Sequence, residues 1–481
     1  MKRLIPLVLA ALAGAAGAAP LEPCRLRGEQ HDALCGKLAR PLDPARPDGP
    51  SIDIHYAVLP ALARNKKPDP VFFFAGGPGQ SAIDLAGGMS RLFARVSNRR
   101  DVVLIDQRGT GRSAPLVCTP PDPTRPLREL ADMEAVQARL ERCRDELRKL
   151  PHGDLRQYTT TIAMADVEAV RQALGAAQVN IVGGSYGTRA VLEYQRQFPQ
   201  AVRRAVIDGV APPDMVLPAT FSPDGQAAFD ALLASCEKDK ACGSRFPDLR
   251  AQWRATLATL PREVSLQHPV TGVAEKLTLT RDMAASLLRG PLYVPALASA
   301  LPVAISEAAQ GRFEPLFGVA GAMSGRRGVG ELAEGMHFSV VCAEDMPRLD
   351  RAADLPGPDL GDGFSRLYRA VCAGWPRGAV PEAFYTMPPA QTATLVLSGG
   401  IDPVTPPRHG ERAAKALGAK ARHVVVPQAG HGVMGIGCMR DVLFRFIDAE
   451  SEADALKVDT ACVEGIPRPP AFQPIRPGSA S

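Results

Sequence analysis

The segment that most constrains the fold is Gly183-Gly184-Ser185-Tyr186-Gly187, which reads G-x-S-x-G. It follows a short apolar run, Val179–Val182, and precedes a helical pattern, Thr188–Phe198. In a sharp strand-to-helix turn of this kind, side chains two residues before and after the serine would collide, so both places require glycine. The pattern and its context predict that Ser185 stands exposed at the end of a strand, where it can act as a nucleophile.

Short apolar, β-branched runs alternate with helical patterns, which favours a mostly parallel sheet with helices on both faces. The predicted strands are Ile52–Leu59, Val71–Phe74, Val102–Asp106, Val179–Val182, Ala205–Asp208, Thr394–Ser398 and Arg422–Val426. The predicted helices among them are Ile162–Leu174, Thr188–Phe198 and Arg440–Ala449. The expected fold class is therefore α/β.

The strand rhythm stops between residues 212 and 391, where the pattern is mainly helical. The predicted helices are Gln226–Lys238, Leu249–Leu260, Arg281–Leu288, Pro295–Gln310 and Glu331–Val341, with a hairpin within Val264–Leu279. A stretch of this length suits an inserted lid rather than a loop. We therefore expect a core formed by residues 20–211 and 392–466, a helical lid formed by residues 212–391, and a surface tail at 467–481.

Residues 1–19 have the pattern of a secretory signal peptide. Lys2 and Arg3 precede an apolar run, and the small residues around Ala18 provide a cleavage site. A membrane anchor is the alternative, but the run is short for a span, and no later segment is apolar enough to cross a bilayer. We expect an exported, soluble mature protein in the periplasm or outside the cell, with no stable membrane insertion after cleavage.

Composition and motifs argue against three classes of partner. The formal net charge is +5, and about +3 without Lys2 and Arg3, and basic residues do not cluster among aromatic ones, so nucleic acid is not expected. The cysteines lack paired CxxC spacing, which argues against a metal site. The glycine-rich segment Ala75–Gly79 lacks the spacing of a phosphate-binding loop, so no cofactor is expected.

Ten cysteines, an even number, support export, because disulfides form in oxidising compartments. The simplest pairing joins neighbours in the sequence: Cys24–Cys35, Cys118–Cys143, Cys236–Cys242, Cys342–Cys372 and Cys438–Cys462. Sequence alone does not fix the connectivity, and the alternative is that some of these residues are buried free thiols.

Asp402 and His431 are the candidates for completing a catalytic triad with Ser185. A serine hydroxyl needs a base, usually a histidine that a carboxylate orients. Both residues follow predicted strands, so they should lie at the same edge of the sheet as Ser185. Of the other histidines, His423 falls within a strand and His409 opens a helix. The alternatives are a loop histidine at His431 and a turn or helix-cap carboxylate at Asp402.

An oxyanion hole needs backbone N–H donors that point at the developing charge. Tyr186, directly after the nucleophile, is expected to provide one donor. The other should come from the segment Ala75–Gly79, whose glycines let the backbone approach a ligand closely. A further segment after a strand, Asp106–Ser113, is interpreted as a tight structural turn near the site rather than as a source of catalytic groups.

Five segments together resemble the proline iminopeptidase and tripeptidyl aminopeptidase family of α/β-hydrolases. They are Gly76-Gly77-Pro78-Gly79, Asp106-Gln107-Arg108-Gly109-x-Gly111-x-Ser113, Gly183–Gly187, Gly400-Ile401-Asp402-Pro403-Val404-Thr405-Pro406 and Gly430-His431-Gly432. The resemblance implies the α/β-hydrolase fold, a triad of Ser185, Asp402 and His431, and oxyanion donors at Gly77 and Tyr186. It also implies release of residues or short peptides from free N-termini. The cysteines, export signal and large insert look most like the tripeptidyl aminopeptidase branch.

The lid also holds a candidate anchor for the substrate amine, Glu344, with Asp345 as second choice. An exopeptidase must recognise the chain end, and a carboxylate in a desolvated lid can pair with its ammonium and set the distance to Ser185. The resemblance supports an acidic anchor in general without specifying the residue. The alternative is a solvated surface pair or a helix cap.

Three functions stay open at this point. The first is an exported serine exopeptidase that acts on peptides with free N-termini. The second is a secreted esterase or other small-molecule serine hydrolase with the same triad. The third is a non-catalytic scaffold that binds a partner through the lid, and the complete order of Ser, Asp and His argues against it. Peptidases and esterases share acyl chemistry, so the triad does not separate the first two.

Overall fold

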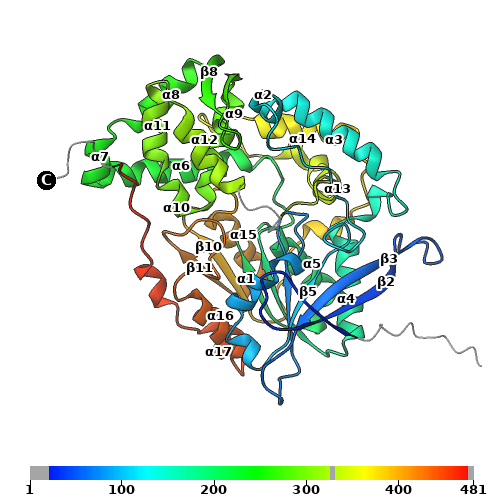
Figure 1. The fold of residues 1–481 in the computed structure, drawn as a ribbon. Helices are drawn as coiled ribbons and strands as arrows, with labels where there is room; N and C mark the ends of the chain where they lie inside the picture. Colours follow the sequence, from blue (N-terminus) through cyan, green and yellow to red (C-terminus); the bar gives the residue numbers. More distant parts are fainter. Residues whose placement is uncertain (1–20, 325–330, 475–481) are drawn as a thin grey trace, which may run out of the picture.

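The computed structural model describes residues 21–324 and 331–474. The predicted signal peptide, residues 1–19, and the end of the predicted tail lie outside this range. The described residues form a nine-stranded sheet, a two-stranded hairpin and the helices that surround them (Figure 1).

All seven predicted strands are confirmed within the nine-stranded sheet. In chain order its strands are β1 (Glu22–Cys24), β2 (Ala33–Pro41), β3 (Ser51–Leu59), β4 (Val71–Phe74), β5 (Val102–Ile105), β6 (Val179–Gly184), β7 (Val202–Asp208), β10 (Thr394–Gly399) and β11 (Ala421–Val426). Their order in space is β1-β2-β3-β5-β4-β6-β7-β10-β11. Neighbours from β5 to β11 pair in parallel, as the α/β pattern predicts.

The sequence did not predict β1 and β2, which extend the sheet as antiparallel strands beyond β3. Only Ala33 is fully buried in β2, and the other residues of the strand are partly or fully exposed. Such a strand lacks the apolar run or the strict alternation by which strands are recognised in a sequence.

Helices cover both faces of the sheet. One face packs against α1 (Ala86–Leu92), α16 (Met439–Asp448) and α17 (Glu452–Leu456), and the other against α4 (Thr160–Ala173), α5 (Tyr186–Gln197) and α15 (Pro407–Leu417). In β4, Phe72 and Phe74 point into one apolar cluster while Val71 and Phe73 point into the other. Successive side chains of a strand point to opposite faces, so a strand that is apolar throughout fits a sheet covered on both sides.

The chain between β7 and β10 forms a mainly helical unit, which we call the lid. Its elements are α6 (Phe221–Lys238), α7 (Lys240–Arg245), α8 (Leu249–Ala258), β8 (Arg262–Gln267), β9 (Ala274–Leu279), α9 (Arg281–Arg289), α10 (Pro295–Ala298), α11 (Leu301–Ala309), α12 (Glu314–Ser324), α13 (Glu334–Glu344) and α14 (Gly363–Ala373). Much of it has an apolar core of its own, in which the rings of Phe229 and Trp253 pack edge to face. Figure 1 shows these helices stacked over one end of the sheet.

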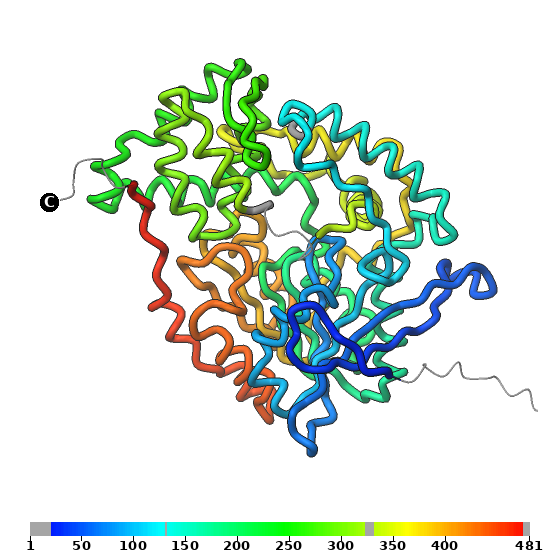
Figure 2. The backbone as a smooth tube through the Cα atoms, in the orientation of Figure 1, coloured from blue at the N-terminus to red at the C-terminus, as the bar shows by residue number. Residues whose placement is uncertain are grey.

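Two helices from the first half of the chain also lie against the lid. They are α2 (Leu127–Ala131), which contacts β9, and α3 (Met133–Leu147), which contacts α13 and α14; Figure 2 shows this segment of the chain against the lid. Arg139 of α3 forms a two-pronged ion pair with Glu334 of α13, at 2.6 and 2.7 Å. Two separate segments of the chain therefore cover this end of the sheet: the lid, which the sequence predicted, and α2 with α3, which it did not.

The five disulfides join the pairs predicted from the sequence. They are Cys24–Cys35, Cys118–Cys143, Cys236–Cys242, Cys342–Cys372 and Cys438–Cys462. The fourth ties α13 to α14 within the lid. Within residues 21–324 and 331–474, no helix is both long and apolar enough to span a bilayer.

Candidate active site

Ser185 stands between β6 and α5 in a backbone conformation that non-glycine residues rarely adopt, with φ 56° and ψ −126°. A Cβ atom on Gly183 would collide with the carbonyl oxygen of Gly187, and one on Gly187 would collide with the backbone of β4. At Gly184 the nearest atom to such a Cβ would be 3.9 Å away, which is ordinary contact. The predicted turn is thus confirmed, including which of its glycines the turn requires.

His431 and Asp402 meet at the same edge of the sheet, each beyond the end of its strand. The Nδ1 atom of His431 lies 2.8 Å from Oδ2 of Asp402. The backbone N–H groups of Val404 and Thr405 donate to Oδ1 of Asp402, at 2.8 and 2.9 Å, and the Thr405 hydroxyl donates to Oδ2 at 2.8 Å. Asp402 is therefore buried, fully bonded and fixed in its orientation toward the imidazole.

In this pair, each residue stabilises the charged form of the other. Burial lowers the pKa of His431, but the charge and hydrogen bond of Asp402, with help from Asp208, outweigh it and leave the pKa above its ordinary value. Burial raises the pKa of Asp402, but His431 and the two backbone donors outweigh it and leave that pKa below its ordinary value. Such a pair holds the Nδ1 proton on the imidazole and leaves Nε2 free to accept one.

The two other histidines weighed from the sequence have partners elsewhere. Nε2 of His409 lies 2.8 Å from the Asp224 carboxylate, and Nε2 of His423 lies 3.0 Å from the hydroxyl of Ser398. Neither contact involves Ser185. Of these three histidines, the geometry thus brings only His431 together with Asp402.

Asp208, at the end of β7, connects Ser185 to the loop of His431, and only its place at a strand end indicated it in advance. Its carbonyl accepts a 2.8 Å hydrogen bond from the backbone N–H of Ser185. Its buried Oδ2 atom accepts the N–H groups of Val433 and Met434, at 2.7 and 2.8 Å, just after His431. Burial raises the pKa of Asp208 to about 6.

The glycine-rich segment after β4 passes directly against Ser185. A Cβ atom on Gly76 would lie only 3.2 Å from Cβ of Ser185. Gly77 and Gly79 adopt φ values of +112° and +111°, which side chains other than glycine rarely allow. The segment therefore lies where an oxyanion donor is required, although the donor roles of Gly77 and Tyr186 stay predictions.

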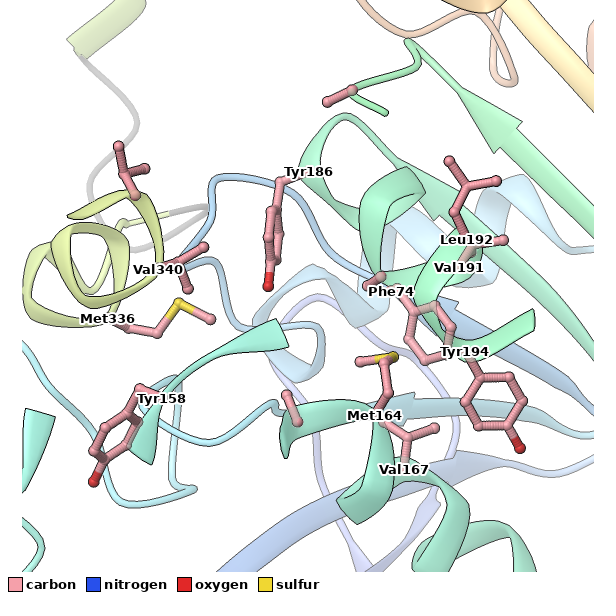
Figure 3. Close-up of a cluster of buried hydrophobic side chains, with 14 of the residues drawn as sticks. Phe74, Tyr158, Met164, Val167, Tyr186, Val191, Leu192, Tyr194, Met336 and Val340 are labelled. Carbon is pink, nitrogen blue, oxygen red and sulfur yellow. The ribbon is translucent and has the colours of Figure 1, made fainter. Parts of the chain in front are cut away.

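The side chain of Tyr186 is buried rather than turned toward a substrate. Figure 3 shows its ring between Met336 and Val340 of α13 on one side and Phe74 of β4 on the other. Its hydroxyl lies 2.7 Å from the Thr160 hydroxyl. Only the backbone of Tyr186 is thus available for an oxyanion.

The segment after β5 has the structural role that its sequence predicts. The guanidinium of Arg108 is buried and donates to both oxygens of Asp166, at 2.7 and 3.0 Å. Asp106 accepts the hydroxyl of Ser81 at 2.7 Å. Both side chains are committed to holding the loops together.

Glu344 and Asp345, the predicted amine anchors, are buried at the end of α13 and both contact Arg189. Arg189 donates to the two oxygens of Asp345, at 2.9 and 3.0 Å, and to Glu344 at 3.3 Å. Glu344 also accepts the backbone N–H of Thr160 at 2.7 Å. The sequence did not anticipate Arg189, which lies one helical turn after Ser185 and whose single positive charge is shared by the two carboxylates. Their role as an anchor stays a prediction.

Two family models match the chain. The model for the alpha/beta hydrolase fold matches residues 69–293, and the model for TAP-like proteins matches residues 359–462. The first match contains Ser185 and the second contains both Asp402 and His431.

Several known proteins are similar to this chain. Serine protease Hip1 of Mycobacterium tuberculosis is 27% identical over 429 residues, which covers 82% of each chain. Tripeptidyl aminopeptidase of Streptomyces lividans is 31% identical over 199 residues, or 37% of this chain and 35% of that one. The crystal structure of proline iminopeptidase from Mycobacterium smegmatis is 16% identical, covers 88% of this chain and 100% of that chain, and has a TM-score of 0.39. Together with the sheet and the geometry at Ser185, the family matches show that the chain is a serine hydrolase of the α/β-hydrolase fold with a TAP-like C-terminal region.

Proposed function

We propose that this protein is an exported serine peptidase that hydrolyses peptide bonds near free N-termini. The observation that carries the proposal is the hydrogen-bonded pair of His431 and Asp402 at the same sheet edge as the strained Ser185. Similarity over most of the chain to a protein named serine protease, and over part of it to a tripeptidyl aminopeptidase, supports a peptide as the substrate.

The reaction divides into two acyl transfers. Oγ of Ser185 attacks the scissile carbonyl carbon while Nε2 of His431 takes its proton, and Asp402 stabilises the resulting imidazolium. The backbone N–H groups of Gly77 and Tyr186 bind the oxyanion. Collapse of the intermediate breaks the C–N bond, and the leaving amine takes the proton from Nε2. Water then attacks the acyl-enzyme with His431 as base, which releases the acid and restores Ser185.

A preference for free N-termini requires a group that binds an ammonium. Glu344 is the candidate, and burial raises its pKa to about 7 despite the nearby Arg189. An ammonium that reaches Glu344 would share that carboxylate with Arg189 and Thr160. If Glu344 is the anchor, Glu344→Gln should lower kcat/KM for free-amine peptides by about thirty- to a thousand-fold and leave a neutral ester unchanged. Equal losses on both substrates would mean that Glu344 supports the fold.

Export is supported by the five disulfides and by the sequence of residues 1–19. We expect the mature chain to begin near Ala19 or Pro20, outside the cytoplasm. N-terminal sequencing of protein from cell fractions tests this proposal, and an intact N-terminus retained in the cytoplasm would contradict it.

The substrate class is tested with three matched compounds: a free-amine peptide amide, its N-acetylated form and a simple acyl ester. An exopeptidase should hydrolyse the free-amine peptide far faster than the acetylated one. Hydrolysis of the ester alone would favour a secreted esterase. That alternative has one observation in its favour, because Arg189 already pairs with the two carboxylates best suited to hold an amine.

A further inference from the structure

The lid reaches the catalytic base through Tyr293, the last residue of the short helix η5 (Gly290–Tyr293). The carbonyl of Tyr293 accepts the backbone N–H of His431 at 3.1 Å. The two rings pack edge to face, with centroids 5.4 Å apart. Tyr293 is thus a wall of the site beside the base.

A chain of contacts runs from Tyr293 to the glycine-rich segment Ala75–Gly79, which passes against Ser185. The guanidinium of Arg289 lies between the rings of Tyr293 and Phe221, and Phe221 packs against Tyr368 at 6.1 Å. The Tyr368 hydroxyl lies 2.8 Å from Nε2 of His337, whose Nδ1 lies 3.1 Å from the Pro78 carbonyl. We call Tyr293, Arg289, Phe221, Tyr368 and His337 the aromatic arc, because these lid side chains connect His431 to the glycine-rich segment after β4.

Arg289 is the charged member of the arc and is only 7% exposed. Its guanidinium carbon lies 4.7 Å from the ring centroid of Phe221, 5.3 Å from that of Phe364 and 5.4 Å from that of Tyr293. Its Nε donates to a backbone carbonyl at 3.3 Å, but its buried Nη2 has no hydrogen-bond partner within the described chain. A buried donor without a partner costs free energy and requires a reason.

Among the other buried arginines of the described chain, Arg204 resembles Arg289, because it forms no ion pair and its buried Nε has no hydrogen-bond partner, but the rest are paired. Three of them pair with carboxylates: Arg100 with Asp69, Arg108 with Asp166, and Arg189 with Asp345. The carboxylates on elements next to Arg289 have partners of their own. Asp224 of α6 bonds Arg408 and His409, and Asp282 of α9 bonds Arg366. No carboxylate within residues 21–324 and 331–474 forms an ion pair with Arg289.

The remaining arc side chains carry no compensating charge. Burial lowers the pKa of His337 and raises the pKa of Tyr368, so both are neutral near pH 7. Arg289 is close enough to His431 that its charge acts to lower the pKa of that imidazole, against Asp402 and Asp208. The arc therefore presents one positive charge on an aromatic surface beside the reacting groups.

We propose that Arg289 is a specificity residue that binds a carboxylate of the substrate close to the scissile bond. The proposal rests on the proposed acyl transfer at Ser185. A planar guanidinium can donate two parallel hydrogen bonds to a carboxylate, and the orphan Nη2 would supply one of them. Stacking on aromatic rings fixes the guanidinium in advance, which lowers the entropy lost on binding. The carboxylate comes either from an acidic side chain or from the C-terminus of a short peptide.

Two substrate pairs distinguish these sources. The first pair differs only in Glu or Gln on the acyl side of the scissile bond, and the second only in a C-terminal carboxylate or amide on the leaving side. Both pairs are tested with the wild type, Arg289→Met and Arg289→Lys. Arg281→Met is the matched control, because Arg281 lies exposed on the same helix. Active enzyme is counted in each sample by titration with a serine-directed phosphonate.

The wild type should favour the carboxylate member of at least one pair by about ten- to a hundred-fold in kcat/KM. Arg289→Met should bring that ratio to about one, Arg289→Lys should keep part of it, and Arg281→Met should leave it unchanged. Equal kcat/KM for both members of both pairs in the wild type would overturn the proposal, even if Arg289→Met fails to fold. So would a ratio that survives Arg289→Met. If no peptide is hydrolysed, the proposed peptidase function fails, and a pair of acyl esters that differ by one carboxylate still decides the role of Arg289.

Discussion

At the sheet edge, Asp402 is held by four hydrogen bonds, three of them from its own loop and one from His431. In the aromatic arc of the lid, Arg289 is held by three rings and has a buried nitrogen without a partner. Both groups are buried and both lie near His431, so burial alone does not explain the difference. The Asp402 carboxylate has its hydrogen bonds without a substrate, whereas the Arg289 guanidinium has a buried nitrogen without a partner.

This difference matches two tasks. Chemistry requires groups that stay in place throughout the reaction, and backbone donors at strand ends provide that fixity. Recognition requires groups that gain more from the substrate than they have without it. Substitutions at the sheet edge should therefore reduce the turnover of every substrate, whereas substitutions in the arc should change the ranking of substrates.

The largest effect is expected from Ser185→Ala. Removing the nucleophile should lower kcat by about six orders of magnitude for peptides and esters alike. Steady-state kinetics with both substrate types measures it. A loss confined to one substrate type would mean that a second nucleophile serves the other.

Asp402→Asn should cost about four orders of magnitude in kcat, because an amide can hold the imidazole in the wrong tautomer and cannot stabilise the imidazolium. The effect should again be uniform across substrates. Single-turnover kinetics of acylation is the measurement, and Asp106→Asn is the control, since Asp106 is a buried carboxylate that bonds Ser81 rather than His431. If Asp402→Asn acylates as fast as the wild type, another residue orients the base.

The Cys342–Cys372 disulfide joins the helices that carry His337 and Tyr368 of the arc, and it closes 30 residues of sequence. Replacing both cysteines with alanine should lower the stability of the lid by about 3.5 kcal/mol in the chain-entropy model. Limited proteolysis should detect cleavage between α13 and α14 first. The ratio between carboxylate and neutral substrates should fall, while phosphonate labelling of Ser185 should change little. If the loss of the disulfide slowed phosphonate labelling of Ser185 as much as it lowered the substrate ratio, the lid and the sheet edge would not have separate roles.

Two substitutions at Asp208 distinguish its role in positioning the loop after His431 from the effect of its negative charge. Asp208→Ala removes the acceptor of two buried N–H groups after His431 and should lower kcat by about ten- to a hundred-fold. Asp208→Asn keeps an oxygen for both N–H groups and should keep kcat within about ten-fold of the wild type at its optimum. Equal losses in the two variants would contradict a positioning role.

The smallest effects concern pH. The pKa of His431 lies above its ordinary value, so activity should rise with pH through a midpoint above about 6.5, as the base loses its proton. Asp208→Asn removes a negative charge that raises this pKa, so the midpoint should move to lower pH. Arg289→Met removes a positive charge that lowers it, so the midpoint should move to higher pH. Profiles of kcat/KM on a neutral ester measure both shifts, and shifts in the same direction would contradict these charge assignments.

The sheet edge was largely predictable from the sequence. Ser185 follows a strand that ends in G-x-S-x-G, and Asp402 and His431 each follow a later strand. Because parallel strands end at a common edge, the sequence predicts that these three residues lie together. The disulfides were predictable because each joins neighbours along the chain.

The arc was not predictable. The rings of Phe221 and Tyr368 pack against each other although the two residues are far apart in the lid sequence. The periodicity of either helix does not predict which other helix it packs against. The pairing of Arg189 with Asp345 and the packing of α3 against the lid have the same character. Local patterns identify elements and their buried faces, whereas contacts between distant elements depend on the packing of the whole chain.

We expect Ser185 to be the residue that is acylated during turnover, and covalent labelling identifies that residue. The purified protein is treated with a serine-directed phosphonate, digested and mapped by mass spectrometry, with Ser185→Ala and His431→Ala treated in parallel. We expect a single adduct on Ser185, its absence in Ser185→Ala, and labelling slowed by several orders of magnitude in His431→Ala. An adduct on another serine, or labelling of Ser185→Ala at the wild-type rate, would show that Ser185 is not the nucleophile.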